Sequence, residues 1–165
     1  MSALTTPQAE AFLYREALLL DEGDYDAWLD LFTRDAVFWM PAWRNESEQT
    51  ADPDRELSLI YYEGRSNLED RIKRIRSGLS VASKVRLRVM HAISNVMITA
   101  EGPRSATVSS CFIVHLVDVR ASRTHAFFGR YEHELVDTPE GWRISRKLIR
   151  LLNDVVPTLL DVYSI

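Results

Sequence analysis

The sequence predicts one α+β domain in which N-terminal helices pack on a curved, mainly antiparallel sheet. Two observations lead to this prediction. Apolar residues recur at helical spacing near the N-terminus, and four long strand-like runs follow one another from residue 84 onward. A chain of 165 residues has room for one sizeable core, and no linker, repeat or low-complexity tract divides it. We therefore expect residues 1–165 to form a single domain.

The composition is that of an ordinary globular protein, with 46% hydrophobic and 27% charged residues. The net charge of −4 gives nucleic acid no general attraction to the chain. The charge is unevenly distributed, because residues 1–56 hold 4 basic and 13 acidic side chains and the remainder holds 16 and 11. Such a polar distribution can orient a protein against a partner or a copy of itself. No apolar run approaches the ~20 residues of a membrane span and no signal-peptide pattern is present, so we expect a cytoplasmic protein.

Two helices are expected at the start of the chain. The first spans residues 7–22, with Thr6 as its cap, Pro7 as its first helical residue and Gly23 as its end. Asp24 can cap a second helix. Its apolar residues recur at spacings of three and four: Tyr25, Trp28, Leu29 and Phe32.

Residues 36–43 form the first expected strand, which is rich in aromatic side chains. A polar loop of about ten residues follows at 44–54. A loop of this length often has a purpose, and here it would act as a lid or hold a neighbouring subunit.

A strand, a turn and a helix are expected between residues 57 and 78. The strand 57–62 has apolar side chains on both of its faces, which predicts cover on both sides. Ser66 and Glu69 have the spacing of a capping box, and Gly78 lies where the helix would end. The apolar side chains of this helix recur at helical spacing: Leu68, Ile72 and Ile75.

Four long strands are expected at residues 84–99, 105–121, 124–136 and 142–152, with Gly, Pro or Ser turn signals between them. Consecutive strands joined by short turns form an antiparallel meander, and their length predicts strong curvature. The last segment, 153–165, ends on apolar residues, so we expect it to pack against the domain.

Several segments also carry a family resemblance. They are Asp52-Pro53-Asp54-Arg55-Glu56-Leu57-Ser58-Leu59-Ile60-Tyr61-Tyr62, Arg65, Leu68-Glu69-Asp70-Arg71, His91-Ala92-Ile93-Ser94-Asn95, Asn153-Asp154 and Asp161-Val162-Tyr163. In these segments the chain resembles the small (beta) subunit of aromatic-ring-hydroxylating dioxygenases of the benzoate and anthranilate type. The likeness runs from Phe12 to Ile165, and residues 76–89 depart from it. It implies the cone-shaped α+β fold that is also found in nuclear transport factor 2 and ketosteroid isomerase.

The resemblance implies a non-catalytic structural subunit of a Rieske-type dioxygenase that acts on an aromatic acid. Three small subunits would form a homotrimer and bind three large catalytic subunits. The large subunit would carry the Rieske 2Fe–2S cluster and the mononuclear iron, and a reductase would deliver electrons from NADH. The sequence agrees with this division, because a Rieske centre needs two cysteines and two histidines and the chain has the single cysteine Cys111. Its four histidines are spread over several strand-like runs without ligand spacing, so we expect no metal on this chain.

The residues expected at subunit contacts are charged or aromatic. A rigid helix at 66–77 would present its outer charges to a neighbour, although a solvated helix face would contribute very little. The candidates are Arg65, Asp70, Arg71, Tyr61, Tyr62, Trp43, Asp161 and Tyr163.

The alternative is a stand-alone enzyme of the same fold, an isomerase, dehydratase or small cyclase with a pocket inside the cone. In that pocket His91 or His115 could pair with a carboxylate such as Asp35, and Tyr61 could polarise a carbonyl. A hydrogen-bonded polar core is the simpler interpretation of the same side chains.

Overall fold

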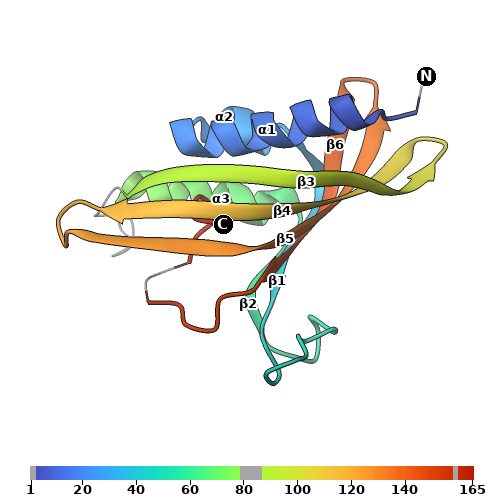
Figure 1. The fold of residues 1–165 in the computed structure, drawn as a ribbon. Coiled ribbons are helices and arrows are strands. Elements are labelled where there is room, and N and C mark those ends of the chain that lie inside the picture. Colours follow the sequence, from blue (N-terminus) through green and yellow to red (C-terminus); the bar gives the residue numbers. More distant parts are fainter. Residues whose placement is uncertain (1–2, 79–86, 158–159) are drawn as a thin grey trace.

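The computed structural model describes residues 3–78, 87–157 and 160–165 and contains helices on one six-stranded sheet (Figure 1). The helices are α1 (Thr6–Glu22), α2 (Tyr25–Leu29) and α3 (Arg65–Ser77). The strands are β1 (Phe32–Pro41), β2 (Ser58–Glu63), β3 (Arg88–Gly102), β4 (Ser105–Asp118), β5 (Arg123–Thr138) and β6 (Gly141–Leu151). Among the described helices none is long and apolar enough to cross a membrane.

The sheet has the strand order β2-β1-β6-β5-β4-β3. Strands β3 to β6 are paired antiparallel in sequence order, which confirms the predicted meander. Strand β1 lies parallel to β6 and antiparallel to β2. The predicted strand at 84–99 is described from Arg88 and extends to Gly102, whereas residues 84–86 lie outside the described ranges.

The long strands are curved, and β3 shows one cause of the curvature. Asn95 has a φ of 54°, and the register of β3 against β4 shifts between Ser94 and Met97. An irregularity of this kind inserts extra backbone into one strand and bends it. In Figure 1 the strands β3, β4 and β5 sweep across the molecule, α1 runs along β3, and β1 and β2 extend to the opposite end.

The core lies between the helices and the inner face of the sheet. The alternation of buried and exposed residues along β4 and β5 places every second side chain in this core. Its largest fully buried apolar side chains are Trp28, Phe38, Phe112, Phe127, Leu13, Met40, Leu68, Ile72, Leu135, Ile144 and Ile149. Among the described residues, no helix covers the outer face of the long strands (Figure 1).

The helix ends differ in detail from the predicted ones. Helix α1 is capped by Thr5, one residue earlier than predicted, and the Thr5 backbone N–H donates to the Gln8 side chain (2.9 Å). Helix α2 has Asp24 as its cap, as predicted, but it ends at Leu29 because the chain from Phe32 onward pairs with β6. The predicted ends at Gly23 and Gly78 are confirmed, and both glycines adopt the left-handed conformation.

The predicted capping box of α3 is wrong. The helix begins at Arg65, and Gly64, with a φ of 85°, turns the chain directly from β2 into the helix. Ser66 is therefore already helical, and Glu69 accepts a hydrogen bond from the Arg65 side chain (2.9 Å).

The predicted two-sided cover of β2 is also wrong. This strand lies at the edge of the sheet, and Leu57 before it is 80% exposed. Leu59 also faces outward, whereas Ile60 and Tyr62 pack against the core. Apolar residues on both faces therefore did not distinguish an edge strand from a central one.

The C-terminal segment packs against the domain, as predicted. Val162 and Ile165 are buried with the core of the domain. The Ser164 backbone N–H donates to the Asp161 carbonyl (2.9 Å), which forms a tight turn before the last residue.

Candidate functional site

The interior of the cone holds a buried ion cluster formed by Glu16, His133 and Lys147. The Lys147 ammonium donates to Glu16 Oε1 at 2.7 Å, and His133 Nε2 lies 2.9 Å from Glu16 Oε2. Each of the three residues is at most 2% exposed. The Trp28 indole N–H completes the cluster by donating to Glu16 Oε1 at 3.4 Å.

The cluster is assembled from one helix and two neighbouring strands. Glu16 lies on the buried stripe of α1, between Leu13 and Leu20. His133 on β5 is directly opposite Lys147 on β6 in the strand register, so both side chains point from the inner face of the sheet toward α1. Glu16 therefore meets both groups where α1 crosses the sheet.

The charge states of Glu16, His133 and Lys147 follow from their burial and from the charges that they exert on one another. Burial alone would raise the pKa of Glu16, but Lys147 and His133 together outweigh this and hold the pKa well below its usual range. Burial lowers the pKa of His133, against the opposing effect of Glu16. At neutral pH the cluster therefore contains a carboxylate, an ammonium and a neutral imidazole whose Nε2–H donates to Glu16.

The surroundings of the cluster are aromatic. The Lys147 ammonium lies 4.3 Å from the centroid of the Tyr131 ring and 5.7 Å from that of Phe38. Burial, followed by the charges of Glu16 and Asp21, raises the pKa of Tyr131 well above its ordinary value. The carboxylate is thus held as an anion and the phenol as a neutral group. The cluster joins α1 to the sheet, and its charged atoms are closed off from solvent.

Acid is expected to destabilise the fold in two steps. Below the ordinary His value of 6.5, the unfolded chain protonates His133 while the folded chain, with its lowered pKa, does not. Below the ordinary Glu value of 4.5 the same difference applies to Glu16. In both ranges the unfolded state binds more protons, so the free energy of unfolding falls as the pH falls. Urea unfolding between pH 8 and pH 3 measures both steps.

The matched variants for this experiment are His133→Gln, which keeps a hydrogen-bond donor, and His115→Gln on the exposed outer face. Between pH 7.5 and 5.5, His133→Gln should make the free energy of unfolding depend less on pH. His115→Gln should leave this pH dependence as it is in the wild type. Equal slopes for both variants would contradict the assignment of the first step to His133.

The four residues expected in an enzyme pocket are not brought together. The His91 ring is buried, and its Nδ1 lies 2.6 Å from Asp21 Oδ1, so its carboxylate partner is Asp21 and not Asp35. Asp35 is exposed on β1, and His115 is exposed on the outer face of β4. Tyr61 lies on the edge strand β2 opposite Trp39. The two histidines separate because they lie on opposite faces of the same sheet.

The buried cluster was missed by the sequence analysis, although each of its members carries a signal. Glu16 interrupts the apolar stripe of the first helix, three residues after Leu13 and four before Leu20. His133 occupies a core position in β5, which alternates, and Lys147 lies in a run of three buried residues of β6 with Leu148 and Ile149. Ionisable residues at core positions of three elements indicate a buried polar network, because single buried charges are strongly unfavourable.

Two of the expected contact residues, Arg71 and Asp161, pair within the chain. The Arg71 guanidinium binds the Asp161 carboxylate through two nitrogens, with Nε at 2.9 Å from Oδ1. Asp161 is 1% exposed, and its Oδ1 also accepts from the Val162 backbone N–H (2.8 Å). Hydrogen bonding to Asp161 raises the pKa of Arg71. The pair ties the C-terminal segment to α3.

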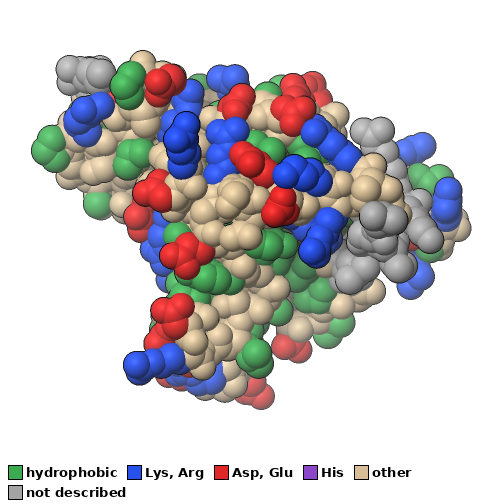
Figure 2. All heavy atoms as spheres, turned by 180° about the vertical axis from the view of Figure 1, so that it is seen from behind, with side chains coloured by type: hydrophobic (Ala, Val, Ile, Leu, Met, Phe, Trp, Pro, Cys, Tyr) green, Lys and Arg blue, Asp and Glu red, His purple; other side chains and the backbone are tan. Residues whose placement is uncertain are grey.

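The charged candidates on α3 also have partners within the chain. Arg65 contacts Asp30 and Glu69, both at 2.9 Å, and Asp70 contacts Lys73 at 3.0 Å on the surface. Figure 2 shows this side of the molecule, where basic and acidic side chains are interspersed.

The aromatic candidates are partly or largely buried. Tyr62 packs against Phe38 with ring centroids 6.4 Å apart. Burial raises the pKa of the Tyr163 phenol to about 12. The Trp43 indole N–H donates to the Leu151 carbonyl at 3.0 Å, which fixes the start of the loop after β1 against β6.

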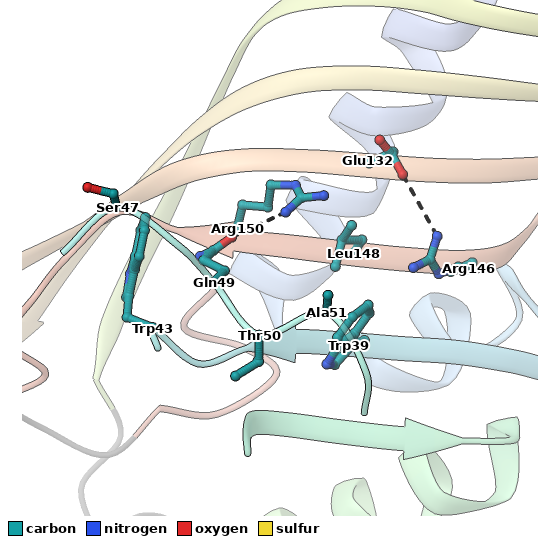
Figure 3. Close-up of a pocket in the computed structure, with 10 residues that line it drawn as sticks. All are labelled: Trp39, Trp43, Ser47, Gln49, Thr50, Ala51, Glu132, Arg146, Leu148 and Arg150. Atoms are coloured by element: carbon teal, nitrogen blue, oxygen red, sulfur yellow. Dashed lines mark hydrogen bonds and ion pairs between the residues drawn. The ribbon is translucent and has the colours of Figure 1, made fainter. Parts of the chain in front are cut away.

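An open groove of about 390 Å³ lies between this loop and the outer face of β6 (Figure 3). Arg146 on one side of the groove pairs with Glu134 (2.9 Å) and Glu132 (3.8 Å). Arg150 on the other side donates to the Gln49 side-chain oxygen (3.3 Å). The remaining lining residues are Trp39, Trp43, Ser47, Thr50, Ala51 and Leu148.

A metal centre requires several donor side chains at one point. Within residues 3–78, 87–157 and 160–165, no group of three or more His, Cys, Asp or Glu side chains has this arrangement. The single cysteine, Cys111, is half-buried on β4.

A family model described as the ring hydroxylating beta subunit matches residues 15–158. The chain belongs to this family. This beta subunit is 37% identical over 155 residues to the 2-halobenzoate 1,2-dioxygenase small subunit of Burkholderia cepacia, covering 94% of this chain and 93% of the relative. It is 33% identical over 165 residues to the benzoate 1,2-dioxygenase subunit beta of Acinetobacter baylyi, covering 100% and 96%. The predicted family is therefore confirmed.

Solved structures confirm the predicted fold. The beta subunit of benzoate 1,2-dioxygenase from Burkholderia mallei superimposes with a TM-score of 0.83 at 33% identity, and all of both chains is covered. A protein like nuclear transport factor 2, from Novosphingobium aromaticivorans, has a TM-score of 0.61 at 16% identity and covers 91% of this chain and 84% of its own. The second likeness concerns the fold alone.

Proposed function

We propose that this beta subunit is the structural small subunit of a Rieske-type ring-hydroxylating dioxygenase that acts on an aromatic acid. The observation that carries the proposal is the likeness over the whole chain to small subunits of benzoate-type dioxygenases. The stand-alone isomerase, dehydratase or cyclase is disfavoured, because the likeness to such enzymes is limited to the fold.

The division of chemistry between the subunits follows from the donor atoms. A Rieske cluster needs two cysteines and two histidines, and the chain has one cysteine. The residues present do not fit the 2Fe–2S cluster, and among the described residues no three His, Cys, Asp or Glu side chains are grouped to hold a mononuclear iron. We therefore propose that the large subunit carries both. Electrons would reach them from NADH through a reductase, and we propose that the complex lies in the cytoplasm.

The buried ion cluster supports a structural role for this chain. In an enzyme of this fold, the interior of the cone would have to admit a substrate and present acid–base groups to it. Here Glu16, His133 and Lys147 satisfy one another and are closed off from solvent. Their contribution is to hold α1 on the sheet.

We propose further that the chain forms a homotrimer within a complex of three large and three small subunits. Exposed apolar side chains on the outer face of the sheet support an interface there: Met90, Met97, Ile113 and Phe128. The candidates on α3, Arg65, Asp70 and Arg71, stay candidates for contacts with a neighbour, and Arg71 would act there while paired with Asp161.

Purification of the tagged chain from the organism that encodes it tests the proposed function. We expect a larger chain with Cys-x-His and Cys-x₂-His motifs to co-purify, and the complex to carry iron and the spectrum of a Rieske cluster. Oxygen uptake should require an aromatic acid, NADH and the reductase. The separated small subunit should be colourless. Turnover by the separated chain alone, or purification without a larger chain, would overturn the proposal.

A further inference from the structure

Two arginines lie side by side on the outer face of the sheet without a counter-charge. Arg130 on β5 is directly opposite Arg150 on β6, and both are exposed. Arg150 donates only to the Gln49 amide oxygen, and across the described parts of the chain neither guanidinium has a carboxylate within 4.0 Å. Like charges directly opposite each other on neighbouring strands are destabilising. The two-residue cluster Arg130–Arg150, called here the arginine pair, therefore favours an external anion.

Another arginine on the outer face of β6, Arg146, is paired within the chain and differs in this from Arg130 and Arg150. Arg146 has two carboxylates, Glu134 at 2.9 Å and Glu132 at 3.8 Å, so its charge is compensated within the chain. On the helix side of the molecule the charges are likewise interspersed (Figure 2). The arginine pair differs from both environments, because it is exposed and no described carboxylate lies within 4.0 Å of it; Glu132, which lines the hollow beside the pair, lies 3.8 Å from Arg146.

The surface around the arginine pair is hollowed and partly apolar. The groove of Figure 3 borders Arg150 on one side. A second hollow of about 380 Å³, which includes Met97 and Cys111, borders both arginines on the other side. Met97 is 61% exposed, and Ile113 and Phe128 lie opposite each other in the adjoining row of the sheet. A protein segment that carries carboxylates and an apolar side chain would fit this surface, with the carboxylates against the arginines and the apolar side chain against the exposed apolar residues.

The chain itself carries a segment of that chemistry. The loop at residues 42–57, called here the acidic loop, extends at the end of β1 and β2 away from the helices (Figure 1). It contains five carboxylates, of which three pair with arginines of the same loop: Glu48 and Glu56 with Arg44, and Asp52 with Arg55. The other two, Glu46 and Asp54, are exposed and have no basic partner within the described residues.

We propose that the acidic loop of one copy docks on the outer sheet face of the next copy, with Glu46 and Asp54 against the arginine pair. Two unpaired carboxylates then meet two unpaired guanidiniums, and Leu57, which is 80% exposed, supplies an apolar contact. Within one copy only Gln49 of the loop contacts the arginine pair, through Arg150 at 3.3 Å, while Glu46 and Asp54 have no basic partner among the described residues. Because the carboxylates and the guanidiniums are different groups, the contact between copies is heterologous and closes into a ring when the rotation between copies allows it. The inference rests on the proposed homotrimer and names the surfaces that form it.

Charge reversal on each side, followed by reversal of both, tests the contact. Arg130→Glu with Arg150→Glu should weaken self-association of the full chain about tenfold or more in sedimentation velocity, and Glu46→Arg with Asp54→Arg should do the same. The variant with all four changes should recover most of the affinity, because the same two pairs form with opposite signs. Arg120→Glu with Arg123→Glu is the matched control, since it changes the net charge equally at the exposed β4–β5 turn and should leave association unchanged.

Recovery in the fourfold variant supports the contact. An unchanged affinity after reversal of the arginine pair, or a loss that the fourfold variant does not recover, would overturn it. Co-purification with the large chain is measured on the same variants. If the wild-type chain binds the large chain but the fourfold variant does not recover self-association, only the loop contact is refuted. If the wild-type chain binds no large chain, the proposed function is refuted.

Discussion

Replacing Lys147 by alanine is expected to lower the free energy of unfolding by about 3–5 kcal/mol. The change would leave Glu16 as a buried carboxylate whose strongest partner is gone, with only the His133 and Trp28 donors remaining. Guanidinium unfolding should show a lower midpoint with an unchanged slope, because the folded state loses stability without losing compactness.

Two further variants isolate the cause of this effect. Lys73→Ala removes an ammonium that pairs with Asp70 at 3.0 Å on the surface of α3, and its unfolding midpoint should stay within error of the wild type. Glu16→Leu combined with Lys147→Met should recover part of the loss, since apolar side chains of similar size avoid the desolvation of two ions. A loss for Lys147→Ala no larger than for Lys73→Ala would mean that Glu16 is not held as a buried anion.

Replacing Arg71 by alanine is expected to destabilise the separated chain by about 2–3 kcal/mol. The change strands the Asp161 carboxylate, which is 1% exposed, and frees the C-terminal segment from α3. The expected loss is smaller than for Lys147 because the Arg71 side chain is 21% exposed and its charge is partly solvated. Thermal unfolding of the separated chain measures it, and limited proteolysis near residue 157 should become faster.

Arg74→Ala is the matched control, because Arg74 lies on the same helix with an exposed side chain. Arg71→Lys should give an intermediate loss, since lysine keeps the charge but not the two-nitrogen geometry. The same variants measure the proposed interface role. If Arg71 also contacts a neighbour, Arg71→Ala should weaken assembly by more than its effect on the separated chain explains. Equal stability of the Arg71→Ala and Arg74→Ala chains would contradict the intrachain role.

The architecture could be predicted from the sequence because its signals are local. The helix ends at Gly23 and Gly78 need a left-handed residue, and the sequence supplies glycine at both places. The long alternating runs determine the strands of the meander, and Gly141, with a φ of 101°, marks the turn between the last two. The order of residues from Asp52 to Arg71 was sufficient to identify the family. The cap of α1 is one residue earlier than predicted because Thr5 and Thr6 have equivalent side chains. The cap of α3 is two residues earlier because Gly64, with no side chain, turns the chain from β2 into the helix.

The pairings that matter for stability and assembly were decided only by the tertiary structure. Glu16 lies 117 residues from His133 and 131 from Lys147, and Arg71 lies 90 residues from Asp161. Arg130 and Arg150 become neighbours only through the register of β5 and β6. A residue's type and the period around it show whether it faces the core, but a partner on a distant element depends on which strands pair and in which register. Electrostatic interactions between distant segments act only once the packed sheet has set that register.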